Sequence, residues 1–368
     1  MMNPNPAHIA AYLTDRLGAA VQVLALTSLG AGEESAAADG KPRSVKTYGY
    51  GQPLLVQYRV GNQERQAVLR TMQADQFGHE QRSDRAASML LSYDIFNTLP
   101  RHVRALDVGV LLPDGRPKSL GDGGEFFLLT DYVTGQLYAH DMQRLRDTGQ
   151  RTDLDLHRAR RLAEYLAEIH AVRRDDSAQY RRHLRDVLGS GEGIMGLADS
   201  YPPDFALADA AWLERVEQAC VAWRWRLKGK ARRLAQMHGD FHPFNVLFGD
   251  DDELWLLDRS RGAWGEPADD VSCMAINYLF FSLLRSGALE PPFVELWDAF
   301  WTTYLDRTAD SELLTVIAPF FAWRALVVAS PVWYTIADEV RAALFRFVDN
   351  VLAAPAFDPE RANAYLHG

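Results

Sequence analysis

The chain has 368 residues, of which 48% are hydrophobic and 24% are charged, and its formal net charge at pH 7 is −10. The composition is that of a globular protein, and the length exceeds what one hydrophobic core usually organises, so we expect two lobes. The acidic balance argues against a nucleic-acid partner. No run approaches the roughly 20 apolar residues that a membrane helix needs, and the first residues lack the basic start and apolar core of a signal peptide. We therefore expect a cytoplasmic protein with no membrane partner, and its oligomeric state stays open.

The two cysteines, Cys220 and Cys273, both lie in apolar segments of helical character. Neither has a second Cys or a His at a spacing that suits zinc. Two buried thiols are favoured over a disulfide, which the sequence alone does not exclude.

The first part of the chain is predicted to be rich in sheet. Apolar residues at helical spacing predict helices over residues 7–18 and 77–96. Between them, residues 30–51 are rich in Gly, Ala and Ser and predict a long loop. Strand-like runs occur at residues 21–29, 53–60, 65–70, 108–112 and 125–129. The turn Gly61-Asn62 suggests that the second and third of these runs form a hairpin, and we expect the last two to pair with each other.

The pattern becomes helical from about residue 134 onward. Helical spacing predicts a helix over residues 154–172, a helix or a pair of helices over 206–235, and several more over 275–353. A short interruption with strand character, residues 245–257, lies inside this helical half. It predicts a small hairpin there.

The residues with the most evident chemistry are the run His238-Gly239-Asp240-Phe241-His242-Pro243-Phe244-Asn245 and the acid Asp258 at the end of the predicted hairpin. Phosphoryl transfer needs a carboxylate that orients and deprotonates the attacking hydroxyl, and oxygen ligands that hold Mg²⁺. A hairpin brings its two ends together, so Asn245 can meet Asp258 at one metal while Asp240 faces the substrate. The spacing of Asp240 and Asn245 matches the protein-kinase catalytic loop. A chance loop with Asn and Asp as turn residues is the plainer alternative.

The same run resembles the catalytic loop of the aminoglycoside phosphotransferase and choline kinase superfamily, whose usual form is His-Gly-Asp-x-His-x-x-Asn. The resemblance implies an α+β, bilobal, protein-kinase-like fold with a sheet-rich N-lobe and a mostly helical C-lobe. It also implies that Asp240 is the catalytic base and that Asn245 and Asp258 bind Mg²⁺. His242 would stabilise the loop and Asp270 would anchor it, although an ordinary helix N-cap also explains Asp270.

Part of the expected nucleotide site lies in the predicted hairpin and the helix after it. Residues 66–70 resemble the third strand of the family, which implies that Arg70 is the cation over the nucleotide phosphates, with Asp84 or Glu80 as its acidic partner. A solvent-facing arginine at the end of a strand is the alternative.

The remaining expected nucleotide contacts come from two loops. Gly30 and Gly32 follow the first strand, where glycines let backbone N–H groups approach phosphates; a flexible insertion explains this stretch equally well. Residues 126–135 are similar to the family's interlobe connector, which places Asp131 and Val133 near the purine base. The plainer alternative, a strand followed by a Thr-Gly turn, is compatible with such a connector and also with a segment that has no nucleotide contact.

The sequence departs from the family directly after Asp258. The family commonly has an aromatic residue and then an acid, whereas this chain has Arg259-Ser260-Arg261. The two arginines would hold substrate or nucleotide phosphates, or pair with the acidic turn 250–253. Aromatic residues in the helical half suggest either a core or, less often, a cage for a quaternary ammonium group: Trp264, Tyr278, Trp297, Trp301, Trp323, Trp333 and Tyr334.

These observations predict a kinase that uses ATP or GTP, with Mg²⁺, to phosphorylate a small-molecule hydroxyl in an aminoglycoside-like, amino-alcohol or sugar substrate. Residues 1–133 would form the nucleotide-binding N-lobe, and residues 134–368 the C-lobe with catalytic loop, metal site and substrate pocket. A nucleotide-binding pseudokinase of the same fold is the main alternative. A protein kinase is disfavoured because the Asp-Phe-Gly and Ala-Pro-Glu motifs are missing.

Overall fold

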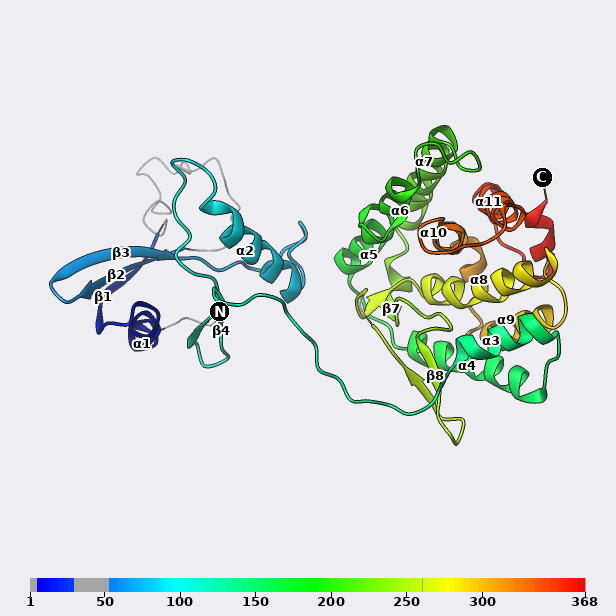
Figure 1. The fold of residues 1–368 in the computed structure, drawn as a ribbon, viewed down its shortest axis with the longest axis horizontal. Helices are drawn as coiled ribbons and strands as arrows, with labels where there is room; N and C mark the ends of the chain where they lie inside the picture. Colours follow the sequence, from blue (N-terminus) through cyan, green and yellow to red (C-terminus); the bar gives the residue numbers. More distant parts are fainter. Residues whose placement is uncertain (1–4, 30–52, 260, 368) are drawn as a thin grey trace. The chain divides into compact units, whose positions relative to one another are not determined.

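The computed structural model describes residues 5–29, 53–259 and 261–367. The chain divides into two compact units, Met1–Thr130 and Asp131–Gly368. The first combines strands with helices, and the second is mostly helical (Figure 1). Among the described residues, no helix combines the length and the apolar character that crossing a membrane requires.

The first unit is built on a three-stranded antiparallel sheet in the order β1-β2-β3, with β1 Val21–Ser28, β2 Leu54–Val60 and β3 Gln63–Leu69. Helix α1 (Pro6–Leu17) packs on β1. The helix predicted over residues 7–18 and the predicted hairpin are both confirmed, whereas the helix predicted over 77–96 begins later, as α2 (Arg82–Phe96). Gly61 takes a φ of +57° in the two-residue turn, a conformation that favours glycine. The small core of this unit centres on Ile9, Val56 and Tyr58.

The predicted pairing of residues 108–112 with 125–129 is wrong. Strand β4 (Gly109–Leu111) pairs with β5 (Pro117–Ser119), which lies inside the segment expected to be a turn. The reversal at Asp114-Gly115 is tight enough to close a short hairpin there, since Leu112 donates its N–H to the carbonyl of Arg116 at 2.8 Å. Residues 125–129 form no strand, and the Phe127 side chain is exposed. An apolar run alone therefore misidentified the partner.

A three-stranded sheet in the second unit supports the segment with the expected chemistry. Its order is β6-β8-β9, with β6 Gln136–Leu137, β8 Val246–Phe248 and β9 Leu254–Leu256. The predicted hairpin is confirmed as β8 and β9, whereas the two-residue β6 was not predicted. Just before β6, a Cβ on Gly135 would lie 2.5 Å from the backbone carbonyl oxygen of Phe248, so glycine at this position lets the two segments approach closely.

The second unit also has a two-stranded sheet of β7 (Ala235–Gln236) and β10 (Trp264–Gly265), and helices make up most of what remains. Residues 206–235 contain one long helix followed by a short 3₁₀ turn, and the long helix expected near residue 275 begins eight residues earlier, at Pro267. Helices α3, α5 and α6 were not predicted. The helices are α3 Tyr138–Thr148, α4 Asp153–Ala171, α5 Ser177–Gly189, α6 Ile194–Ser200, α7 Ala210–Leu227, α8 Pro267–Ser286, α9 Phe293–Thr308, α10 Ala318–Ala329 and α11 Asp338–Ala353.

Most of the candidate cage aromatics belong to the core of the second unit. Tyr278, Trp297, Trp301 and Trp323 are buried, so the interpretation of these rings as a ligand cage is wrong. A helix that is apolar on all faces is buried in the core, and the burial of its aromatic side chains stabilises the fold. The two cysteines are free and buried, as expected.

A buried group of charges holds the N-terminus of α8. Arg233 donates to Glu266 through Nε at 2.9 Å and through Nη2 at 2.7 Å, and both of its terminal nitrogens reach Asp310 at 2.8 Å. Tyr180 donates to the second oxygen of Glu266 at 2.8 Å. Glu266 is the N-cap residue of α8, so this network positions the first turn of that helix.

Candidate active site

The predicted catalytic loop joins β7 (Ala235–Gln236) to β8 and is anchored from below by the first turn of α8. Asp270 accepts the backbone N–H of His238 on Oδ2 and that of Gly239 on Oδ1, each at 2.7 Å. Gly239 has a φ of +92°, which turns the chain so that both N–H groups face one carboxylate. The anchoring role expected for Asp270 agrees with this geometry.

His170, at the end of α4, completes the anchor. Its Nε2 lies 3.2 Å from Oδ2 of Asp270 and its Nδ1 lies 2.8 Å from the hydroxyl of Tyr304. Burial alone would raise the pKa of Asp270, but the hydrogen bond with His170 and those from the loop lower it below its ordinary value. His170 is therefore a packed structural residue.

Asp240 follows the anchored backbone and is surrounded by cationic groups. Its Oδ1 lies 2.8 Å from Nη1 of Arg324 and 3.2 Å from Nη1 of Arg261. Its Oδ2 lies 3.5 Å from Nε2 of His242, whose Nδ1 accepts the N–H of Phe244 at 3.2 Å. Burial would raise the pKa of Asp240, but the hydrogen bond from His242 and the two guanidinium groups lower it well below its usual range. The carboxylate is thus held ionised.

Asn245 and Asp258 lie at the open ends of the hairpin. Leu257 donates its N–H to the carbonyl of Asn245 at 2.9 Å, which places residue 258 one position beyond this pair. The amide Nδ2 of Asn245 donates to the carbonyl of Asp240 at 3.1 Å, so its Oδ1 is left as an acceptor. Asp258 is exposed and forms no ion pair with any described residue.

These two side chains have the chemistry that Mg²⁺ requires. One amide oxygen and one carboxylate are hard oxygen ligands, and neither is used by another described group. The described residues hold no group of three or more His, Cys, Asp or Glu that could form a metal cage. A magnesium ion held here would therefore take its other ligands from nucleotide phosphates and water, as Mg²⁺ commonly does.

Neither arginine after Asp258 pairs with the turn between β8 and β9, so that expectation is wrong. Arg259 donates to the carbonyl of Met237 through Nε at 3.0 Å and through Nη2 at 2.7 Å. Arg261 reaches Asp240 and donates to Glu192 at 3.0 Å. Both side chains point back to the loop, where the carbonyl of Met237 and the carboxylate of Asp240 are their partners.

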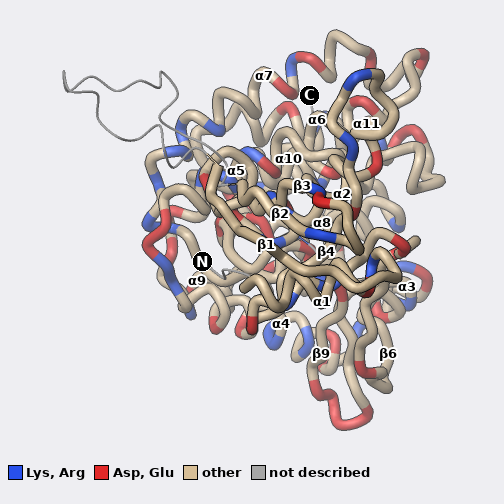
Figure 2. Tube along the Cα trace, turned by 90° about the vertical axis from the view of Figure 1, so that its left-hand side faces the viewer, with Lys and Arg blue, Asp and Glu red and all other residues tan. Residues whose placement is uncertain are grey.

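The acidic turn 250–253, the red loop beneath the β9 label in Figure 2, is held from α4 instead. Arg158 donates to Asp252 through Nε at 2.7 Å and to Asp141 through Nη1 at 2.6 Å. Its guanidinium also lies 4.3 Å from the centroid of the Phe248 ring. Arg158 therefore fixes the closed end of the hairpin whose open end carries Asn245 and Asp258.

Replacing Arg158 with methionine is expected to lower the free energy of unfolding by about 2 kcal/mol, because the half-buried Asp252 and the buried Asp141 lose charged hydrogen bonds. Urea denaturation measures this change. Arg307→Met is the matched control, since Arg307 pairs with Glu164 at the surface and such pairs contribute at most about 1 kcal/mol. Equal losses in the two variants would contradict the role given to Arg158.

With this geometry in place, comparison with known proteins identifies the family. The model of the phosphotransferase enzyme family matches residues 56–308, which is more than half of the chain. The chain belongs to the phosphotransferase enzyme family. The match confirms the resemblance that rested on residues 238–245, and with it the α+β, protein-kinase-like fold class.

Solved structures of other phosphotransferases are similar at a lower level. A glucosamine kinase in complex with glucosamine, ADP and inorganic phosphate is 17% identical over 61% of this chain and 57% of its own, with a TM-score of 0.34. A choline kinase from Streptococcus pneumoniae is 12% identical over 94% and 99%, with a TM-score of 0.33. An aminoglycoside-3′-phosphotransferase of type VIII is 17% identical over 84% and 92%, with a TM-score of 0.33.

The chain spans 56–57% of the glucosamine kinase chains that it matches. No curated protein matches its sequence.

Four nucleotide-binding residues were predicted in the first unit, and the structure describes two of them. Arg70 directly follows β3 and is exposed. Asp84 lies in the first turn of α2 (Arg82–Phe96), where its Oδ2 accepts the N–H of Gln81 at 2.6 Å. Gly30 and Gly32 lie outside the described residues. The roles of all four stay predictions.

Asp131 and Val133 lie at the start of the second unit, in extended chain that leads into β6. Asp131 is exposed and Val133 is partly buried. Because β6 pairs with β8, this segment leads into the sheet that contains the hairpin after the catalytic loop. Their expected contact with the purine stays a prediction.

Sequence reasoning missed Arg324, which contacts Asp240. It lies more than 80 residues away in the chain, so spacing gave no indication of the contact. The available signal was its position as the one charged residue of the apolar run Ala318–Ala329. A buried guanidinium in such a run requires a carboxylate partner from elsewhere in the fold.

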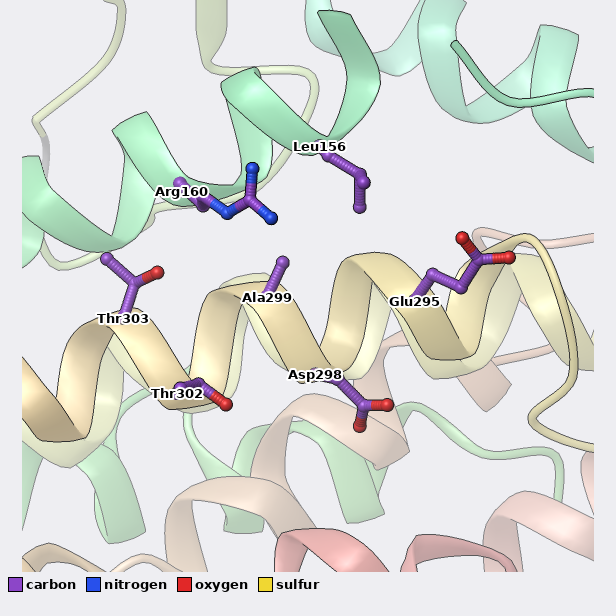
Figure 3. A pocket seen from close by; sticks show the side chains of 7 residues that line it. All are labelled: Leu156, Arg160, Glu295, Asp298, Ala299, Thr302 and Thr303. Atoms are coloured by element: carbon purple, nitrogen blue, oxygen red, sulfur yellow. The ribbon is translucent and has the colours of Figure 1, made fainter. Parts of the chain in front are cut away.

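A surface hollow of about 290 Å³ lies between α4 and α9, where Arg160 faces Thr303 and Ala299 (Figure 3). It contains no residue of the loop 238–245 or of the hairpin. Its walls carry a mixture of charged, hydroxyl and apolar side chains with no convergent set of ligands. The chemistry of the loop, not the size of this hollow, therefore identifies the candidate site.

Proposed function

We propose that this family member is a small-molecule kinase, which transfers the γ-phosphate of ATP or GTP to a hydroxyl group of an aminoglycoside-like, amino-alcohol or sugar acceptor. The observation that carries the proposal is the direct contact between Asp240 and Asn245 in a loop that Asp270 anchors, followed by a hairpin that ends at Asp258. The family match supports the reaction class. A catalytically inactive nucleotide-binding protein is disfavoured because all three polar side chains are present.

Asp240 would orient the acceptor and receive its proton. Phosphoryl transfer passes through a loose transition state, so the protein chiefly positions groups and compensates charge. An ionised carboxylate with a low pKa accepts a hydrogen bond from the hydroxyl and directs its oxygen towards phosphorus. The proton moves to the carboxylate as the new bond forms.

Asn245 and Asp258 would hold Mg²⁺, which when bound neutralises charge on the nucleotide phosphates. Asn245 is fixed for this role by its bond to the Asp240 backbone, so the metal ligand and the carboxylate are positioned together. Arg70 would add a cation over the phosphates.

A thermal-shift and turnover screen tests the proposal. ATP or GTP at about 100 times its Kd should stabilise the protein by about 2.7 kcal/mol, and only in the presence of Mg²⁺. One member of a panel of alcohols should then be phosphorylated. Asp258→Asn should weaken the Mg²⁺-dependent stabilisation, whereas Asp306→Asn, an exposed acid on α9, should not. Nucleotide binding without transfer to any alcohol would favour the inactive alternative, and no binding would contradict the proposal.

A further inference from the structure

Helix α10 is apolar except for one charged residue. Its sequence from Ala318 to Ala329 is APFFAWRALVVA, and Arg324 is 3% exposed. Removing a guanidinium from water is costly unless charged or carbonyl groups surround it. The partners of Arg324 therefore indicate why an arginine occupies this position.

The Arg324 guanidinium binds three groups. Nη1 donates to Oδ1 of Asp240 at 2.8 Å, and Nη2 donates to Oδ1 of Asp269 at 2.6 Å and to the carbonyl of Gly239 at 2.8 Å. The Cζ atom of Arg324 lies 3.9 Å from the centroid of the Trp323 ring. One rigid group thus links the carboxylate of Asp240 to the backbone of its own loop and to the first turn of α8.

The two oxygens of Asp240 are held differently. Oδ1 has the two close guanidinium contacts, to Arg324 at 2.8 Å and to Arg261 at 3.2 Å. Oδ2 has longer contacts, 3.5 Å to Nε2 of His242 and 3.4 Å to Nδ2 of Asn245. The hydrogen bond that Nη1 of Arg324 donates to Oδ1 restricts rotation of the carboxylate, which leaves Oδ2 as the oxygen for a new, shorter hydrogen bond.

Arg324 is the more deeply buried of the two arginines. Its side chain is 4% exposed, compared with 23% for Arg261, which also reaches the exposed Glu192. The Nε of Arg324 is buried and has no hydrogen-bond partner among the described residues. An apolar side chain of similar length would fill α10 without that cost, so packing alone does not account for the arginine.

We propose that Arg324 is a positioning residue for phosphoryl transfer, which holds the Asp240 carboxylate by Oδ1 so that Oδ2 is presented to the acceptor hydroxyl. The proposal rests on the function proposed above for Asp240. Arg324 itself contacts neither nucleotide nor acceptor in this scheme and acts through the carboxylate.

Steady-state kinetics of Arg324→Met and Arg324→Lys test the proposal, with rates expressed per folded molecule. The methionine variant should lose about 10²-fold in kcat, the effect of a misplacement of about 1 Å, while the KM for the nucleotide stays within about twofold. The lysine variant should recover part of the loss, because it keeps the charge but not the planar fork.

Arg341→Met is the matched control. Arg341 is also a buried arginine, and it donates to the carbonyls of Ala329, Tyr334 and Ile336 without contacting the loop. It should lose stability but not kcat. If Arg324→Met loses only stability, or if lysine restores nothing, Arg324 is a structural residue and the proposal is wrong.

Crystal structures of the wild type and of Arg324→Lys or Arg324→Met separate this proposal from the proposed function. A carboxylate of Asp240 that turns when Arg324 is replaced supports the positioning role, even if the wild type phosphorylates no alcohol, in which case the proposed function alone has failed. A carboxylate that keeps its orientation contradicts the positioning role, whatever the activity.

Discussion

Replacing Asp240 with asparagine is expected to lower the rate of phosphoryl transfer by about 10²–10⁴-fold, the usual contribution of a positioned acid or base. Asparagine keeps the shape of the side chain, but its amide cannot take the hydroxyl proton. Its neutral group also no longer balances the guanidinium groups of Arg324 and Arg261. We therefore expect the loss in kcat and only a small change in the KM for the nucleotide. Single-turnover measurements at saturating nucleotide isolate this step.

The control for Asp240→Asn is Asp306→Asn, which removes an equal charge from an exposed position on α9. It should leave kcat within about twofold, since surface changes away from a site have little effect. Circular dichroism and urea denaturation show whether each variant is folded. Turnover by Asp240→Asn at the wild-type rate would mean that another group orients the acceptor.

Replacing Arg233 with methionine is expected to have the largest effect on stability, a loss of about 3–5 kcal/mol in the free energy of unfolding. Glu266 is fully buried and accepts from Arg233 on both oxygens, so the substitution leaves its charge with no cationic partner among the described residues, only the hydroxyl of Tyr180 and the N–H of Ala268. Asp310 loses its bonds at the same time. Urea denaturation gives the size of the loss.

Arg232→Met is the natural control for Arg233→Met, because the neighbouring side chain is 73% exposed and pairs with Glu312 at the surface. Its loss should not exceed about 1 kcal/mol. Adding Glu266→Gln to Arg233→Met should recover part of the stability, since the uncompensated charge is then removed. A double variant that is less stable than Arg233→Met would contradict this explanation of the network.

The local chemistry of the site could be predicted because it is contiguous in sequence. Residues 238–245 and the hairpin that ends at Asp258 lie within one short segment, so spacing alone related Asp240 to Asn245. The hairpin was recognisable because two strand-like runs flank a turn of four acidic residues. The anchor at Asp270 followed from the family resemblance.

The remaining features depend on contacts between distant parts of the chain. Arg324 reaches Asp240 across 84 residues, and β6 has two residues, too few for a periodicity. The run 125–129 has the composition of a strand, yet the nearer segment 117–119 closes a shorter hairpin with β4. Composition describes how well a strand would pair and does not select its partner.

The most direct test follows a labelled γ-phosphate from the nucleotide to a small-molecule acceptor, in the presence of Mg²⁺ or of a chelator. The wild-type protein should transfer the label to an alcohol only with Mg²⁺, and Asp240→Asn should transfer it at least about 10²-fold more slowly. Label that stays on the nucleotide with every acceptor, or that moves equally well without Mg²⁺ or without the Asp240 carboxylate, would contradict the assignment of this loop and hairpin as a phosphoryl-transfer centre.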